Sequence, residues 1–177
     1  SAMSSGNADL GGLWAPNTYT MEEKAGAKQI CSGQDAGAAV PGALIVRADY
    51  AKENPKDVAA FLAVYLRAWK WMNAHQPEAI AMMKKFYEQG GVTISEASMK
   101  KEFSTRPTYD LAGQLKIMKR PAGGASEVDG WFQKIGAFMQ ANGTFPEAPA
   151  ASKFITDEYM RMVDADPKLK AFANRAD

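Results

Sequence analysis

The sequence predicts a helix-rich α/β fold in which a few short strands come first and about seven helices follow. Two patterns lead to this expectation. In the front part of the chain, short apolar runs are bounded by Gly, Pro, Asn or Asp, which is typical of buried strands. From Asp49 onwards, apolar residues recur every three to four positions, which is typical of amphipathic helices.

Composition excludes several classes of protein. The chain has 177 residues, of which 46% are hydrophobic, so it can form a folded core. Its 21 Lys and Arg residues nearly balance its 20 Asp and Glu residues, which argues against a nucleic-acid-binding protein. Cys31 is the only cysteine and His75 the only histidine, so the sequence predicts no intrachain disulfide, no metal site and no cofactor.

The predicted strands occupy three runs near the front of the chain: 12–15, 27–31 and 43–46. Between the first two, Thr20 to Glu23 has the pattern of a capping box and predicts the start of a short helix. Two or three buried strands cannot form a sheet that is covered on both faces. We therefore expect further strands upstream of Ser4.

The helical part begins with a clear local signal. Asn54 followed by Pro55 predicts a helix start, because Asn is a good cap and Pro suits the first helical position. The apolar face of this helix is predicted at Val58, Phe61, Leu62, Tyr65, Leu66, Trp69 and Met72. Further helices are predicted over 77–89, from the capping box at 93–96 towards Phe103, around 111–118, from Ser126 to Asn142, over 152–163 and after Asp166.

The front segment resembles a known family. Asn7 to Asn17 resembles the "G-x-x-D-A-x-x-x-W-x-P" segment of periplasmic nitrate-, sulfonate- and taurine-binding proteins. Val40 to Ala51 resembles the strand-to-helix step of that family, and Asn54 to Val58 resembles its next helix start. Phe103 to Pro107 and the aromatic helix that contains Trp131 are also similar to its C-terminal section.

The resemblance implies that the chain is the C-terminal half of a bilobed solute-binding protein, with part of a type II periplasmic-binding-protein lobe. It implies a small anionic solute such as nitrate, a sulfonate or taurine, an ABC permease in the membrane as partner, and no enzymatic activity. The expected location is periplasmic, or extracytoplasmic with a lipid anchor. Residues 1–3 are typical of a cloning scar, 4–50 form a strand-rich segment with the crossing between lobes, and 51–177 form the helical remainder.

The candidate ligand-binding residues are Trp14, Asn17, Tyr19, Val40 and Pro41. Trp14 precedes a helix start, and free amides at a helix start can bind an anion. The resemblance implies that the Trp-x-Pro loop lines the cleft and that Val40 and Pro41 belong to the crossing between lobes. In the alternative interpretation, Trp14 is a core aromatic and Pro16 only ends a strand.

Two other functions remain open. One is a helical protein-interaction module, with Trp71 and the methionine-rich helices as its contact surface. The other is an enzyme like the relatives of this fold that make the thiamine pyrimidine, but those rely on histidine and metal-binding cysteines. We also expect the isolated chain to dimerise or to swap domains, because the predicted strands leave uncovered edges.

Overall fold

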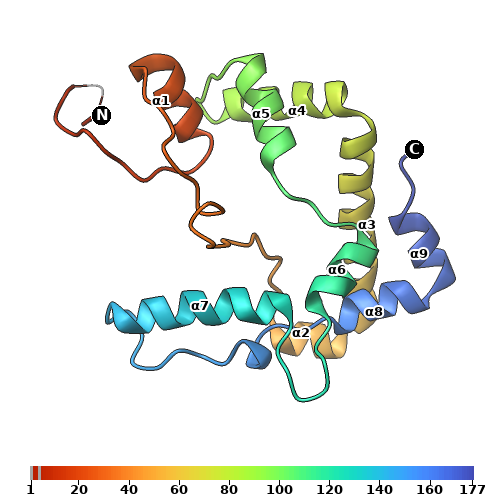
Figure 1. Ribbon diagram of the computed structural model, residues 1–177. Coiled ribbons are helices and arrows are strands. Elements are labelled where there is room, and N and C mark those ends of the chain that lie inside the picture. Colours follow the sequence, from red (N-terminus) through yellow and green to blue (C-terminus); the bar gives the residue numbers. More distant parts are fainter. Residues whose placement is uncertain (1, 4) are drawn as a thin grey trace. The chain divides into compact units, whose positions relative to one another are not determined.

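The computed structural model describes residues 2–3 and 5–177, which form two compact units. Unit 1 comprises Ser1–Ala36 and Met72–Thr108, and unit 2 comprises Gly37–Trp71 and Tyr109–Asp177. The helices, labelled in Figure 1, are α1 Asn17–Ala25, α2 Ala48–Glu53, α3 Pro55–Ala74, α4 Gln76–Gln89, α5 Glu96–Thr105, α6 Leu111–Met118, α7 Glu127–Ala141, the 3-10 helix η1 Ala151–Lys153, α8 Glu158–Ala165 and α9 Pro167–Ala173.

The prediction of an α/β fold is wrong, because the described residues contain helices and no strand. The runs 12–15, 27–31 and 43–46 are irregular backbone. A strand is held by hydrogen bonds to a neighbouring strand, and among the described residues none joins one of these runs to another. Their side chains are also exposed rather than buried, as at Leu13, Ile30 and Ile45.

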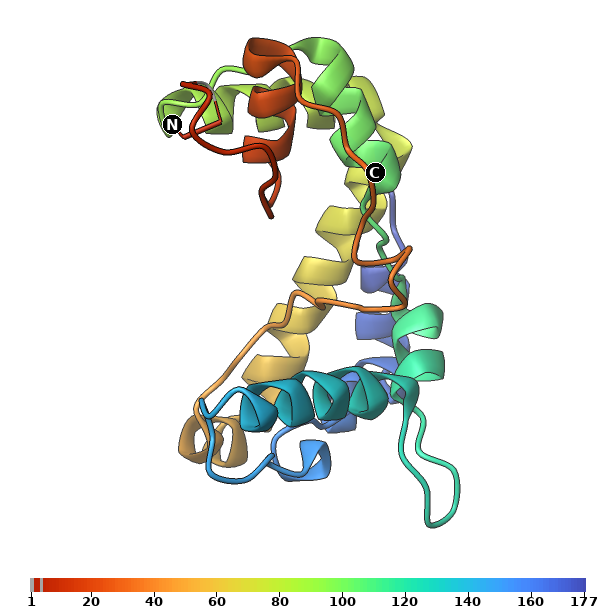
Figure 2. The ribbon, with the colours of Figure 1, turned by 60° about the vertical axis from the view of Figure 1, so that its left-hand side comes forward.

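Unit 1 contains α1, α4 and α5, packed around one buried cluster. Tyr19 of α1, Ile80 of α4 and Met99 of α5 belong to this cluster, together with Ile94. Figures 1 and 2 show α1 beside α5, although about 70 residues separate them in the sequence. The start of α1 therefore has a fixed position on the other helices of its unit.

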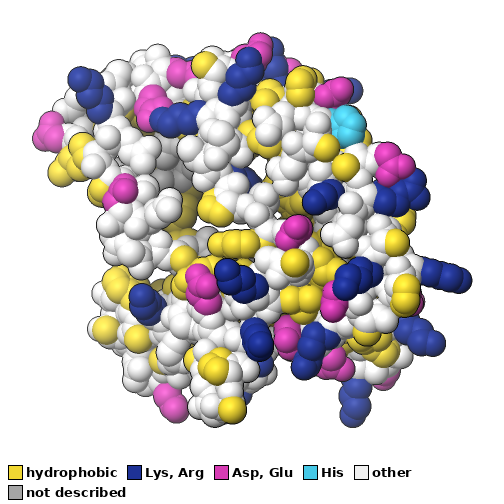
Figure 3. Space-filling model, turned by 45° about the vertical axis from the view of Figure 1, so that its right-hand side comes forward, with side chains coloured by type: hydrophobic (Ala, Val, Ile, Leu, Met, Phe, Trp, Pro, Cys, Tyr) yellow, Lys and Arg dark blue, Asp and Glu magenta, His cyan; other side chains and the backbone are white. Residues whose placement is uncertain are grey.

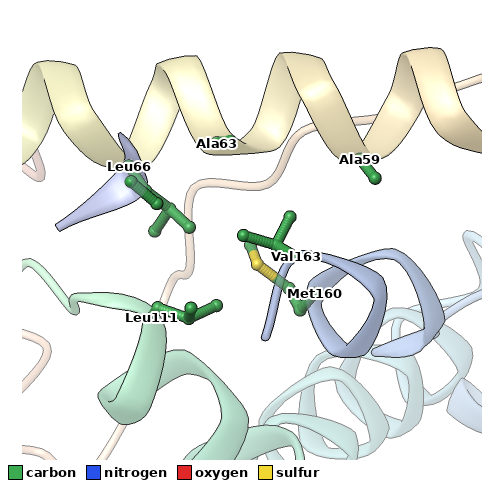
Figure 4. Close-up of a cluster of buried hydrophobic side chains, with 7 residues drawn as sticks. Ala59, Ala63, Leu66, Leu111, Met160 and Val163 are labelled. Atoms are coloured by element: carbon green, nitrogen blue, oxygen red, sulfur yellow. The ribbon is translucent and has the colours of Figure 1, made fainter. Parts of the chain in front are cut away.

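Unit 2 is built around a second cluster, in which α3, α6 and α8 meet (Figure 4). Ala59, Ala63 and Leu66 of α3 face Leu111, Met160 and Val163. The predicted apolar face of α3 is therefore partly wrong: Leu66 is buried, but Phe61 is exposed. Ala59 and Ala63 lie in the core instead of Phe61, because small side chains let the helices approach closely.

Several predicted helix starts are confirmed. α3 begins at Pro55 and α9 at Pro167. The start of α7 is held by a capping box, in which Ser126 accepts from the Asp129 amide and Asp129 accepts from the Ser126 amide. The predicted helix over 152–163 divides instead into η1 and α8, and Thr156 accepts a hydrogen bond from the Glu158 amide at the start of α8.

Arg120, in the loop between α6 and α7, ties three segments of unit 2 together. Its Nε lies 2.6 Å from Asp129 Oδ2 and its Nη2 lies 2.7 Å from Asp129 Oδ1. The same Nη2 also donates to the carbonyl oxygen of Ile155 at 2.8 Å. This guanidinium holds the pKa of the buried Asp129 carboxyl well below its usual range.

The surface carries charges of both signs. On the face drawn in Figure 3, Lys and Arg side chains alternate with Asp and Glu side chains. This mixture agrees with the near-balance of the composition. In the described part of the chain, no helix combines the length and the apolar character that crossing a membrane requires.

Candidate functional site

The loop before α1 presents Trp14 to the solvent. The Trp14 carbonyl oxygen accepts hydrogen bonds from the amides of Asn17 at 2.9 Å and Thr18 at 3.3 Å, so the loop folds back on the start of the helix. Pro16 occupies the N-cap position. The Trp14 side chain is 70% exposed, which excludes the alternative in which it is a core aromatic of this chain.

The start of α1 offers fewer free amides than the sequence suggested. The Asn17 and Thr18 amides are bound to the Trp14 carbonyl, and the Thr20 amide is bound to the Pro16 carbonyl. An anion at this helix start would have to compete with these bonds. Two exposed side chains near this helix start are the Trp14 indole and the amide of Asn17.

Tyr19 has a different position from Trp14 and Asn17. It is buried, and its hydroxyl donates a hydrogen bond of 2.9 Å to Glu102 Oε2 on α5. Glu102 is itself only 4% exposed and also pairs with Arg106. Burial and the hydrogen bond to Glu102 raise the pKa of Tyr19 to about 12. Tyr19 therefore anchors α1 on α5.

Two acidic residues of α1 strengthen this anchor. Glu22 pairs with Lys101, whose Nζ lies 3.0 Å from one carboxylate oxygen and 3.1 Å from the other. The same ammonium lies 5.6 Å from the centre of the Tyr19 ring. Glu23 contacts the first turn of α5.

Glu23 accepts three hydrogen bonds at the start of α5. The donors are the Ser95 amide at 3.1 Å, the Ser95 hydroxyl at 2.6 Å and the Ser98 hydroxyl. Bonds from the Ser95 and Ser98 hydroxyls lower the pKa of Glu23. Ser95 is the N-cap of α5, and its Oγ accepts from the Ser98 amide at 3.1 Å.

The predicted capping box at Thr20 to Glu23 is therefore wrong. These residues lie inside α1, and Glu23 caps α5 instead of its own helix. The contact of α1 with α5 has a signal in the sequence, namely the spacing of three residues in α1. Tyr19, Glu22 and Glu23 are spaced three and four residues apart, so they share one helix face.

The remaining candidates lie in the other unit. Val40 is exposed and Pro41 is half-buried, and both belong to the irregular segment that precedes α2. Trp14, Asn17 and Tyr19 all belong to unit 1. The structure thus brings the Trp14 loop against Asn17 at the start of α1, directs Tyr19 towards α5, and assigns Val40 and Pro41 to unit 2.

The other residues of possible chemical interest are Cys31, His75 and Arg106. Cys31 is exposed, and His75 directly precedes α4. In residues 2–3 and 5–177, no group of three or more His, Cys, Asp or Glu side chains is arranged to hold a metal ion. Arg106, at the end of α5, pairs with Glu102.

Comparison with known proteins finds a family match in the front of the chain. Residues 1–79 match the family described as "NMT1/THI5 like". We call these residues the NMT1/THI5-like segment, after the family that they match. This segment contains the Trp14 loop and the whole of α1, α2 and α3. The family resemblance predicted from the sequence is confirmed for it.

A Bacillus subtilis (strain 168) protein named "Putative aliphatic sulfonates-binding protein" is 33% identical to this chain over 79 residues. The match covers 45% of this chain and 24% of the relative, so the chain corresponds to about a quarter of the relative's length. No solved structure matches the chain. The NMT1/THI5-like segment is thus similar to part of a protein named for binding sulfonates.

Proposed function

We propose that this chain is part of the solute-binding component of an ABC importer, and that its solute is a small anion of the nitrate, sulfonate or taurine type. The observation that carries the proposal is the exposed Trp14. It lies in the NMT1/THI5-like segment, whose sequence is similar to part of a protein that is named as sulfonate-binding. The proposal includes an ABC permease as partner, an extracytoplasmic location and no chemical reaction.

Trp14 and Asn17 are the proposed ligand contacts of unit 1. An indole face suits the carbon part of an organosulfonate, and an amide NH₂ can donate to one of its oxygens. Val40 and Pro41 remain proposed contacts from the segment between lobes. A single exposed loop gives little affinity by itself, since a ligand is usually enclosed from several sides. Affinity in this proposal requires a second lobe that closes over the first.

Calorimetry on the natural protein that contains this chain tests the proposal. The titrants are taurine, short alkanesulfonates and nitrate. We expect at least one of them to bind, and Trp14→Ala to weaken that binding by about tenfold or more, because it removes a large contact surface.

The matched control is Phe86→Ala, which removes an equally exposed aromatic from unit 1 outside the loop. It should leave the affinity unchanged. If no titrant binds, the proposed solute class is wrong. If Trp14→Ala binds as tightly as the wild type, the proposed role of the loop is wrong.

A further inference from the structure

Three carboxylates take part in the polar contacts that hold α1 on α5 in unit 1. Glu22 pairs with Lys101 at 3.0 Å, and Glu23 accepts a hydrogen bond of 3.1 Å from the N-cap amide of α5. In the opposite direction, Glu102 of α5 accepts a hydrogen bond of 2.9 Å from the Tyr19 hydroxyl of α1. Each of these carboxylates therefore joins the two helices, and each can be protonated.

The contact is balanced in charge only while these carboxylates are ionised. The cations that face them are Lys24 on α1 and Lys101 and Arg106 at α5. From α4, the neutral Tyr87 faces Glu102, and burial together with the charge of Glu102 raises the pKa of the Tyr87 hydroxyl. Protonation of the carboxylates would leave cations on both helices and no anion between them, so the two helices would repel each other.

Glu102 connects this contact to the core of unit 1. It is only 4% exposed, and it pairs with Arg106 at the end of its own helix as well as with Tyr19. A buried carboxylate is tolerated because its partners compensate for the lost hydration. Protonation of Glu102 removes the negative charge that both Tyr19 and Arg106 contact, so it weakens the attachment of α1 from inside the core.

We propose that the contact between α1 and α5 is an acid-released latch, which opens when Glu22, Glu23 and Glu102 are protonated and frees the Trp14 loop while unit 2 stays folded. Away from α5, a helix as short as α1 unfolds. The Trp14 loop is hydrogen-bonded to the start of α1 and loses its shape with it. The release of α1 is independent of the proposed function, and only its effect on solute binding rests on that function.

The buried ion pair of unit 2 should survive the acid that opens the latch. Arg120 contacts both carboxylate oxygens of Asp129, at 2.6 and 2.7 Å, and holds the pKa of this carboxyl well below its usual range. Glu23 is exposed, and the uncharged hydroxyls of Ser95 and Ser98 lower its pKa from 4.5. A carboxylate with a lowered pKa stabilises the fold above its ordinary pKa and ceases to do so below its folded-state value. The latch should therefore open as the pH falls below 4.5.

Hydrogen exchange of the whole chain, measured by mass spectrometry, tests the proposal. The rates are expressed as protection factors, so that the pH dependence of the intrinsic exchange cancels. Between about pH 6 and about pH 3.5, we expect the protection of residues 20–25 in α1 to fall by about tenfold or more, while residues 59–66 in α3 keep theirs. If α1 keeps its protection, or if α1 and α3 lose protection together, the proposal is wrong.

A variant with uncharged side chains gives a second readout at constant pH. It combines Glu22→Gln, Glu23→Gln and Glu102→Gln, and we expect its α1 at about pH 7 to exchange as the wild type does in acid, with α3 unchanged. Wild-type protection of α1 in this variant would contradict the latch. Loss of protection in α3 would contradict it as well, because opening would not be confined to unit 1.

The matched control carries the same change at three exposed glutamates outside the contact, Glu53, Glu147 and Glu158, and should keep the wild-type pH profile. A control that exchanges like the first variant would overturn the proposal, because the effect would then come from total charge. Calorimetry with a solute that binds at about pH 7 separates the latch from the proposed function. If α1 opens in acid and the affinity stays unchanged, the latch stands and the proposed role of the Trp14 loop is wrong.

Discussion

At the scale of single residues, Glu23 completes a cap that α5 cannot form by itself. In a capping box, the third residue of a helix accepts a hydrogen bond from the N-cap amide. In α7, Asp129 fills this role for Ser126. In α5, the third residue is Ser98, whose hydroxyl donates to Glu23, and Glu23 of α1 accepts from the Ser95 amide instead. The acceptor of this cap therefore comes from another helix.

We expect Glu23→Gln to destabilise the chain by about 0.5–1 kcal/mol at neutral pH, the usual range for a lost cap at an exposed site. Because the pKa of Glu23 is lowered from 4.5, its contribution is complete above that value and disappears as the pH falls through the pKa of the folded state. Urea unfolding at about pH 7 and pH 3 should therefore show a smaller difference from the wild type at the lower pH.

Glu53→Gln is the matched control, since Glu53 is an exposed glutamate at the end of α2. It should unfold like the wild type at both pH values. A Glu23→Gln variant with the same difference from the wild type at both pH values would show that the charge of Glu23 does not contribute.

At the scale of elements, α3 shows how a buried helix face can be mistaken. Large apolar residues predicted its face, yet Ala59 and Ala63 lie in the core and Phe61 in the solvent. Alanine fits either environment, so a pattern of large residues does not locate it. The core of unit 2 depends on these small side chains.

Ala63→Leu tests this packing. We expect it to lower the free energy of unfolding by about 2 kcal/mol, because a larger side chain has no room between α3 and α8. Ala60→Leu, on the exposed side of the same helix, should change it little. Urea unfolding of both variants measures the difference, and equal stabilities would contradict the close approach of the helices.

The elements also show what a sequence can predict. The starts of α3, α7 and α9 follow from local signals, such as Pro55 at the first position of α3 and Ser126 as the cap of α7, and they are confirmed. The cap formed by Glu23 on Ser95 joins residues 72 positions apart, so no local pattern indicates it. The predicted strand at 43–46 failed because β-propensity describes a fit to neighbouring strands, which this segment lacks within the described chain.

The candidate site rests on the same kinds of local signal. The sequence pointed to Trp14 and Asn17, and in the structure both are exposed and the Asn17 amide donates to the Trp14 carbonyl oxygen. The sequence could not show that Tyr19 faces α5 while Trp14 and Asn17 face the solvent, because the direction of each side chain depends on where α1 packs. Whether these residues bind a solute stays a prediction.

At the scale of the whole molecule, the chain has two cores, and the clusters identified in the described residues have no member in common. Tyr19 belongs to the cluster of unit 1 and Ala63 to that of unit 2. Each core should therefore respond to its own substitutions.

A double-mutant cycle tests this independence. Tyr19→Phe should cost about 1 kcal/mol, since it removes the hydrogen bond to Glu102. Combined with Ala63→Leu, the two effects should add to within about 0.5 kcal/mol. Tyr19→Phe combined with Glu102→Gln is the contrasting pair, and its effects should not add because the two side chains are bonded. A large coupling between Tyr19 and Ala63 would contradict separate cores.

The cap that Glu23 provides has a consequence for the nascent chain. During translation, the residues of α1 leave the exit tunnel before Ser95 has been added to the chain. The helix on which α1 packs is therefore not yet present. Nine residues are too few for a stable helix in water. The Trp14 loop, which depends on the start of α1, therefore acquires its shape only after translation has passed α5.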